Sequence, residues 1–200
     1  MADARDNFPP IGDPGPLGLA GFALTTFVLS FLNAGILPGE ATPVFWTLAL
    51  CYGGLAQLLA GMWEYRKNNT FGATAFCSYG AFWLSLGLME ILMKQGTVNL
   101  GASAGPALGV FLLGWTIFTF YMMIGSFRIN GALSAVFVAL FLAFAFLTLG
   151  KFTGVATYTH LGGYIGILTA LLAWYASAAT ILNTTFGEVV LPVYPHKVGK

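Results

Sequence analysis

Charge is what this 200-residue chain has least of. Only 8% of its residues are Asp, Glu, Lys or Arg, while 58% are apolar. A soluble domain needs far more charged side chains to cover its surface, so the composition argues against a soluble helical protein. The formal net charge of +1 also lacks the basic excess that binds nucleic acid, and no nucleic-acid partner is expected. The composition therefore favours a protein embedded in a lipid bilayer.

Cysteine and reactive motifs are equally scarce. Cys51 and Cys77 both fall inside apolar stretches, which predicts small core residues and neither a disulfide framework nor a metal site. The chain has no nucleophile–base constellation, no metal-ligand cluster and no phosphate-binding glycine loop. We therefore expect no cofactor and no enzymatic activity. Residues 1–16 lack a basic n-region, and the apolar run after them is long for a secretory signal, so a cleaved signal peptide is not expected.

What the chain does have is a series of long apolar runs separated by short polar breaks. A helix needs about 20 mostly apolar residues to cross the hydrocarbon layer. The runs that qualify cover residues 17–37, 44–65, 71–93, 104–127, 132–150 and 158–182. The breaks are too short to fold alone. We predict an all-α integral membrane protein with one six-helix transmembrane domain at 17–182, between an N-terminal segment, 1–16, and a C-terminal tail, 183–200.

Basic residues near the ends of these spans predict the orientation. With six spans, one side of the membrane carries Arg5, Arg66, Lys67, Arg128, Lys197 and Lys200, whereas the other carries Lys94 and Lys151. Cytoplasmic loops hold the excess of Lys and Arg. Both terminal segments are therefore predicted to be cytoplasmic, and the plasma membrane is the expected location.

Polar side chains inside the spans are the candidates for function, because they are costly at membrane depth unless they face protein or water. On the first span Phe22, Thr25 and Asn33 share a helical face, Gln57 lies on a glycine stripe of the second, and Ser78 lies in the third. The hydroxyls of Thr and Ser can bond back to their own helix, whereas an amide cannot be satisfied so easily. No full charge lies at mid-membrane, so the sequence offers no buried carboxylate as a proton relay.

Several segments carry a more specific pattern. The first span opens with Asp13-Pro14-Gly15-Pro16-Leu17-Gly18-Leu19, and the next two spans contain Gly53-Gly54-Leu55-Ala56-Gln57 and Asn69-Thr70-Phe71-Gly72. Together they resemble the acetate uptake transporter family, which includes bacterial succinate–acetate permeases and fungal acetate and ammonia transporters. The resemblance covers nearly the whole chain. The family signature is Asn-Pro-Ala-Pro-Leu-Gly-Leu, so Asp13 and Gly15 depart from it here.

The resemblance implies a homohexamer in which each subunit has its own pore for acetate and related small monocarboxylates, with succinate as a further candidate. It also implies a hydrophobic constriction at the matching positions Phe22, Tyr79 and Leu140. The signature marks the mouth of the pathway through Asp13, Pro14, Pro16, Leu17 and Gly18. To these we add the neutral polar residues Thr25, Asn33, Gln57 and Ser78, with the Tyr79 hydroxyl, as the expected pore lining.

Neutral donors fit the passage of a weak acid. They can replace part of a hydration shell and still release the solute, while an apolar ring favours the protonated acid over the ion. The sequence thus predicts a low-affinity channel or permease for acetate whose flux can follow the proton gradient. Two alternatives stay open: a permease for another small solute such as ammonia, and a membrane assembly or sensory protein without transport.

Overall fold

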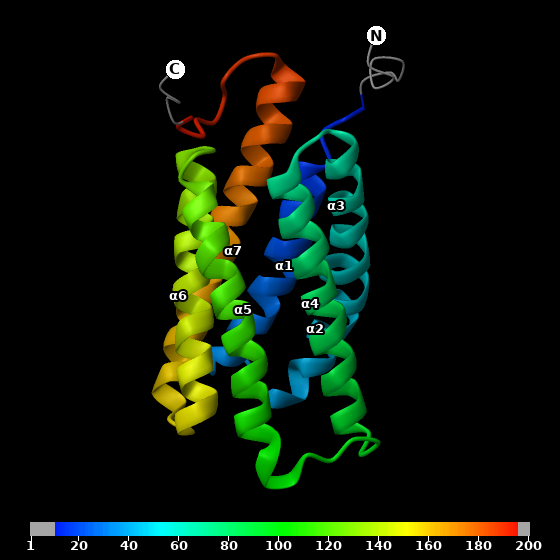
Figure 1. Ribbon diagram of the computed structural model, residues 1–200, viewed down its shortest axis with the longest axis vertical. Coiled ribbons are helices and arrows are strands. Elements are labelled where there is room, and N and C mark those ends of the chain that lie inside the picture. Colours follow the sequence, from blue (N-terminus) through cyan, green and yellow to red (C-terminus); the bar gives the residue numbers. More distant parts are fainter. Residues whose placement is uncertain (1–10, 196–200) are drawn as a thin grey trace.

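Six apolar helical spans run between the two ends of the molecule and alternate in direction (Figure 1). The computed structural model describes residues 11–195. Its elements are α1 (Gly15–Asn33), η2 (Gly39–Ala41), α2 (Thr42–Leu50), η3 (Cys51–Ala56), α3 (Gln57–Arg66), α4 (Thr70–Lys94), η4 (Gly101–Ser103), α5 (Ala104–Ser126), α6 (Gly131–Thr153) and α7 (Ala156–Phe186). Within these residues there is no strand beyond one isolated bridge between Asn130 and Pro195. The predicted all-α membrane architecture with six spans is confirmed.

Two of the turns between spans end in helix-capping residues. The side chain of Asn69 accepts a hydrogen bond from the Gly72 amide at the start of α4, and that of Asn130 accepts one from the Leu133 amide at the start of α6. Such caps satisfy amides that have no partner within the helix. Gly154 ends α6 in the left-handed region, with φ of +70°, which glycine adopts without strain.

The second span is not a single α-helix. Elements α2, η3 and α3 are continuous, and η3 is a π-helical segment in the middle of the span. Here the backbone approaches α1 closely: a Cβ on Gly21 would lie 2.6 Å from the carbonyl oxygen of Tyr52. Thr25 packs directly on Gly53 in the same way. Membrane helices associate largely through such small-residue contacts, because lipid is as apolar as their side chains.

The small-residue face of α7 packs within the chain. A Cβ on Gly163 would collide with the backbone of Ala34, the residue that follows α1, and one on Gly162 would lie 2.7 Å from the Leu147 side chain on α6. Ser177 adds a hydrogen bond of 2.8 Å to the carbonyl of Pro16. The start of α1 is thereby fixed against the last part of α7.

After α7 the chain folds back over the turn between α5 and α6. Asn183 holds this segment by accepting hydrogen bonds from the amides of Val190 and Leu191 and by donating one to the Leu191 carbonyl. The Gly131 amide then donates to the carbonyl of Tyr194 at 2.8 Å. The helix itself continues to Phe186, one turn beyond the span expected from hydropathy.

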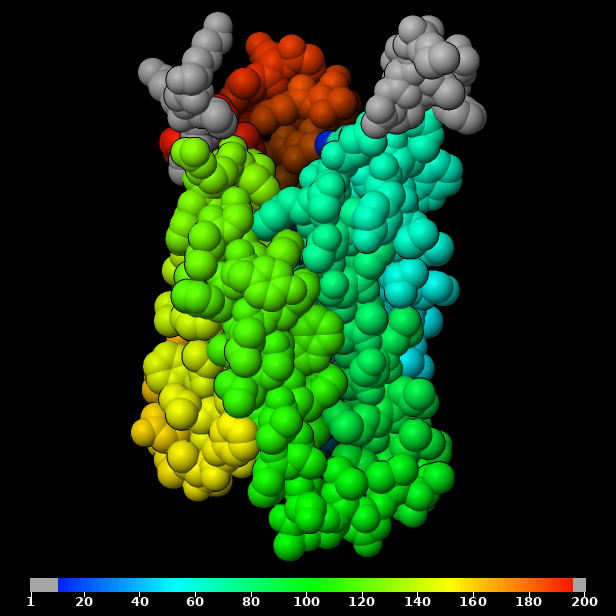
Figure 2. Space-filling view, in the orientation of Figure 1, coloured from blue at the N-terminus to red at the C-terminus, as the bar shows by residue number. Residues whose placement is uncertain are grey.

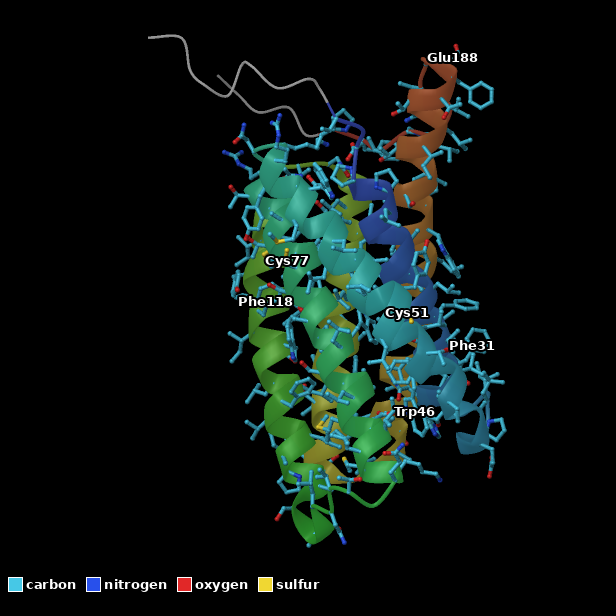
Figure 3. All side chains as sticks on the ribbon, turned by 90° about the vertical axis from the view of Figure 1, so that its right-hand side faces the viewer. Phe31, Trp46, Cys51, Cys77, Phe118 and Glu188 are labelled. Carbon is cyan, nitrogen blue, oxygen red and sulfur yellow. The ribbon has the colours of Figure 1, made fainter. Side chains whose placement is uncertain are left out.

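The start of α1 and the end of α7 lie at the same end of the bundle, here named the termini end (Figure 1). Figure 3 shows Glu188 at this end and Trp46 toward the opposite one. Of the basic residues used to predict orientation, Arg66, Lys67 and Arg128 lie at the termini end, and Lys94 and Lys151 lie at the other. Arg5, Lys197 and Lys200 are outside the described residues.

Candidate transport pathway

Two cavities enter the bundle from opposite ends and meet at the same two side chains, Phe22 and Leu140. The first, the termini-side cavity, has a volume of about 410 Å³ and lies among the starts of α1, α4 and α6 and the end of α3. The second, the aromatic cavity, has a volume of about 90 Å³ and lies among α1, α4, α5, α6 and α7. Figure 2 shows a hollow at the termini end between the tips of α3–α4 and α5–α6.

The structure brings the three residues of the expected constriction together at this junction. Phe22, Tyr79 and Leu140 are all buried and belong to one core cluster. The ring centroids of Phe22 and Tyr79 lie 5.8 Å apart. Phe22 and Leu140 line both cavities, and Tyr79 lines the termini-side cavity. An apolar junction therefore separates the two spaces.

The hydroxyl of Tyr79 is already engaged. It forms a 2.8 Å hydrogen bond with the hydroxyl of Thr119, a fully buried residue of α5. This bond holds the ring in place and turns the polar end of the side chain toward α5. The expectation that the Tyr79 hydroxyl serves as a pore donor stays a prediction: in this arrangement the hydroxyl is bonded to Thr119, and the residue lies on the wall of the termini-side cavity. Thr119, which sequence reasoning did not single out, positions that ring.

Charged side chains gather at the mouth of the termini-side cavity. The ammonium of Lys67 lies 2.9 Å from Asp13 Oδ1, and the same oxygen accepts a hydrogen bond from the Gly15 amide. Glu64 also lines the cavity and accepts a 2.8 Å hydrogen bond from the side-chain amide of Asn69. Among the described lining residues Lys67 is the only cation, and it is paired with Asp13.

The remaining residues of the signature lie at the start of α1 and line neither cavity. Pro14 and Pro16 stand at the start of α1, where the missing amide hydrogen of proline costs nothing. Gly18 lies against the ring of Phe76, because a Cβ there would be 2.7 Å from it. Leu17 points outward, with 45% of its surface exposed.

Gln57 lies deeper on the wall of the termini-side cavity. It is 1% exposed, and its Oε1 has no hydrogen-bond partner within residues 11–195. It is the first residue after the π-helical segment. Its placement agrees with the expected lining role.

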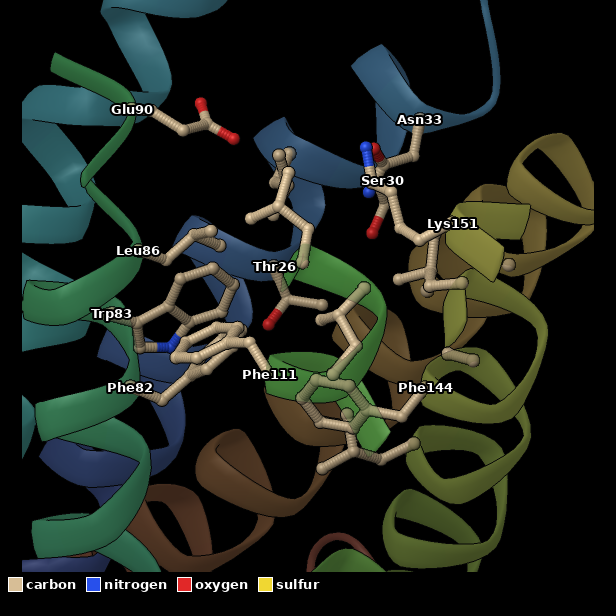
Figure 4. A pocket seen from close by; sticks show the side chains of 18 of the residues that line it. Thr26, Ser30, Asn33, Phe82, Trp83, Leu86, Glu90, Phe111, Phe144 and Lys151 are labelled. Atoms are coloured by element: carbon tan, nitrogen blue, oxygen red, sulfur yellow. The ribbon is translucent and has the colours of Figure 1, made fainter. Parts of the chain in front are cut away.

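Aromatic rings and a few polar groups form the aromatic cavity (Figure 4). The rings come from Phe82, Trp83, Phe111 and Phe144, and the polar groups of α1 come from Thr26, Ser30 and Asn33. Glu90 and Lys151 stand on its wall near the far end of the bundle. The Glu90 carboxylate accepts a 3.0 Å hydrogen bond from the indole nitrogen of Trp46.

Comparison with known proteins identifies the family to which this chain belongs. Residues 5–196 match the GPR1/FUN34/yaaH family. The chain belongs to that family. It is 39% identical over 183 residues to the succinate-acetate/proton symporter SatP of Escherichia coli (strain K12), covering 92% of this chain and 95% of the relative. It is 40% identical to acetate permease A of Emericella nidulans, covering 90% and 65%. It is 42% identical to ammonia transport outward protein 2 of Saccharomyces cerevisiae, covering 84% and 61%.

A solved structure agrees with the fold of this family member. The structure of the bacterial acetate channel SatP superimposes with a TM-score of 0.87 at 38% identity and covers 92% of this chain and 99% of that one. These relatives and the structural match are named as transporters or channels. This member of the family is thus a multi-pass membrane protein built on a transporter fold.

Two expected lining residues are not on the wall of either cavity. The Thr25 hydroxyl donates to the Gly21 carbonyl of its own helix at 2.9 Å, and its side chain packs on Gly53. Ser78 is half-buried and likewise lines neither cavity. Thr26 and Ser30 occupy the wall instead. Their spacing of four and eight residues from Phe22 is the signal that could have identified them.

Proposed function

We propose that this protein is a membrane channel or permease for acetate and related small monocarboxylates. The observation that supports it most strongly is the pair of cavities that approach from opposite ends and meet at Phe22 and Leu140. With Tyr79 beside them, these side chains form the apolar junction between the two cavities, and we propose this junction as the constriction of the transport path. The bacterial symporter and the fungal permease to which the chain is similar are both named for acetate, which agrees with this assignment.

The physical chemistry of the path favours a small weak acid. An unpaired carboxylate entering an apolar junction loses its hydration at high cost, so the protonated acid passes more easily than the ion. Neutral side chains such as Gln57 and Asn33 can replace part of the hydration shell on either side. Net flux then follows the proton gradient without a dedicated proton relay. We propose transport rather than catalysis for the same cavities.

We further propose that the termini end faces the cytoplasm of a plasma membrane, in accord with the basic residues there. We also propose that subunits associate as a hexamer, each with its own path. The apolar residues that α5 exposes, among them Val110, Ile117 and Phe120, are available to lipid or to a neighbouring subunit.

The constriction can be tested by widening it. In vesicles reconstituted with the purified full chain, L140A should raise uptake of labelled butyrate relative to labelled acetate by about tenfold, because the isopropyl group that the substitution removes narrows the junction in the wild type. The matched control is L142A on the same helix, where 42% of Leu142 is exposed on the outside of the bundle. An unchanged butyrate-to-acetate ratio in L140A would argue against the constriction, and absence of acetate flux in the wild type would refute the function.

Ammonia is the second candidate solute, because one fungal relative is named for ammonia transport. The same vesicles separate the two possibilities. Propionate should compete with labelled acetate, whereas ammonium at equal concentration and fixed pH should not. Competition by ammonium alone would favour the ammonia permease.

A further inference from the structure

A third cavity continues the path beyond the aromatic cavity. This space, here named the far-end cavity, has a volume of about 460 Å³ and lies among η2, the start of α2, the end of α4 and the start of α5, opposite the termini end. It shares two lining residues with the aromatic cavity, Glu90 of α4 and Leu108 of α5. The aromatic cavity therefore has a junction at each end, one at Phe22 and Leu140 and the other at Glu90 and Leu108.

The second junction differs from the first because one of its two side chains carries a charge. Glu90 is half-buried, and its carboxylate accepts the 3.0 Å hydrogen bond from the Trp46 indole. Trp46 belongs to α2 and lines the far-end cavity. Hydrogen bonds to an ionised acceptor are stronger than those between neutral groups. The indole therefore ties the carboxylate to α2 and holds it where the two cavities join.

The cations near this junction lie to either side of it. Lys151 of α6 lines the aromatic cavity but not the far-end cavity, and Lys94 of α4 lines the far-end cavity but not the aromatic one. Both lysines are exposed, and neither forms an ion pair with Glu90 within residues 11–195. Figure 4 shows Glu90 and Lys151 on opposite sides of the aromatic cavity. Glu40 of η2 lines the far-end cavity, whereas the described residues of α1, α2, α5 and α7 add no charged or titratable side chain to either wall.

A solute that crosses this junction meets the Glu90 carboxylate at close range. The negative charge repels a carboxylate anion, and the aromatic and aliphatic side chains of the wall screen that repulsion less than water does. The protonated acid carries no net charge, and its O–H can donate to the carboxylate. The two lysines attract the anion before and after the junction but not at it. The junction is therefore a barrier to the anion and not to the acid.

We propose that Glu90 and Leu108 form a second constriction, at which the Glu90 carboxylate selects the protonated acid against its anion. This rests on the proposed function and deepens it, because it assigns the charge selection to one side chain. The first junction opposes ions through the loss of hydration, whereas the second opposes anions through the charge of the protein. Glu90 is thus a specificity-determining residue.

The charge at the second junction can be measured without transport. The probe is L108C in the detergent-solubilised full chain, with both native cysteines replaced (C51A and C77A). A cationic and an anionic methanethiosulfonate of similar size are compared at neutral pH, each relative to its rate with a free thiol in solution. The cationic reagent should react about tenfold faster, and E90Q should reduce this preference to about twofold.

Two features make E90Q a clean variant. The glutamine retains an oxygen for the Trp46 indole, so the side chain stays in place while its charge is removed. E40Q is the matched control, because it removes the same charge from an exposed residue that lines the far-end cavity away from the junction. It should change the reactivity preference by less than about twofold, since that charge is farther away and screened by solvent.

Uptake measures the consequence for transport. In vesicles containing L140A, where the first junction is widened, an inside-positive potassium diffusion potential draws in the acetate anion but not the neutral acid. The potential should accelerate labelled acetate uptake about fivefold in L140A/E90Q, because the like charge is gone, and less than about twofold in L140A and in L140A/E40Q.

The two measurements together decide the proposal. It is overturned if E90Q leaves the reactivity preference of L108C unchanged, if E40Q lowers it as much, or if L108C reacts with neither reagent. It is also overturned if the potential accelerates uptake equally in L140A and L140A/E90Q. If the wild type takes up no acetate but L108C behaves as expected, the proposed transport fails while the acidic junction stands.

Discussion

The two cavities differ in almost every property that acts on a solute. The termini-side cavity is about 410 Å³ in volume and has Asp13, Glu64 and Lys67 on its wall. The aromatic cavity is about 90 Å³ and is dominated by rings, with Glu90 and Lys151 near its far end. Nevertheless, both end at Phe22 and Leu140. The same constriction therefore separates a wide space, with charges at its mouth, from a narrow one with mostly aromatic walls.

This difference suggests that the two cavities act on different steps of transport. Charges at a wide mouth change the local concentration of ions over a distance, but they do not discriminate between solutes of different size. A narrow cavity does discriminate by size and polarity, because a solute must fit into it and find hydrogen-bond partners there. We therefore expect substitutions in the aromatic cavity to act on passage itself, and those at the termini-side mouth to act on access.

The largest effect is expected from filling each cavity with the same side chain. Ala143 lines the aromatic cavity and Ala75 lines the termini-side cavity, and each is 4% exposed. A cavity of roughly 150 Å³ is needed to accommodate benzene, so A143F should block the smaller space and lower acetate uptake at least tenfold. A75F leaves most of the larger space open and should lower uptake by less than about threefold.

Overpacking can also destabilise a helical bundle, so both variants must be compared as folded protein. Thermal unfolding and size-exclusion profiles in the same detergent provide that check. Equal loss of flux in two equally stable variants would remove the distinction between the cavities.

A smaller effect is expected from the charged mouth. D13N removes the carboxylate that neutralises Lys67 but retains an oxygen for the Gly15 amide. The released ammonium should raise acetate uptake at low substrate concentration by about threefold in low salt, and the gain should vanish near 1 M salt because charges are then screened within about 3 Å. Initial uptake rates at two ionic strengths measure this.

The control for D13N is E188Q, which removes a carboxylate from an exposed position at the same end but outside the cavity lining. Its uptake should match the wild type at both salt concentrations. Since the Asp13–Lys67 pair is partly solvated, D13N should cost less than about 1 kcal/mol of stability. A gain that persists in high salt would show that it does not arise from charge.

The sequence predicted the spans more completely than it predicted the residues that line the cavities. Long apolar runs separated by polar breaks predicted all six spans, because the bilayer requires a fixed length of apolar helix. Which residues of a span face the path was harder to predict. Thr25 and Thr26 both lie near Phe22 on the first helix, and choosing between them depends on how α1 rotates against η3. That rotation depends on the close contact of Thr25 with Gly53, and hydropathy carried no sign of the π-helical segment that contains Gly53.

The smallest effect is expected at Tyr79, where the two cavities meet. Its hydroxyl is bonded to Thr119, so Y79F should change acetate flux by less than about twofold. The free energy of unfolding should fall by about 1 kcal/mol, the typical net value of one hydrogen bond. T119V should have a similar cost, and the double variant should cost little more than either alone, because both remove the same bond. Unfolding curves and uptake rates of the four proteins complete the cycle. A large loss of flux in Y79F with little change in T119V would mean that the hydroxyl turns to the solute, and the junction would then be polar on its termini side.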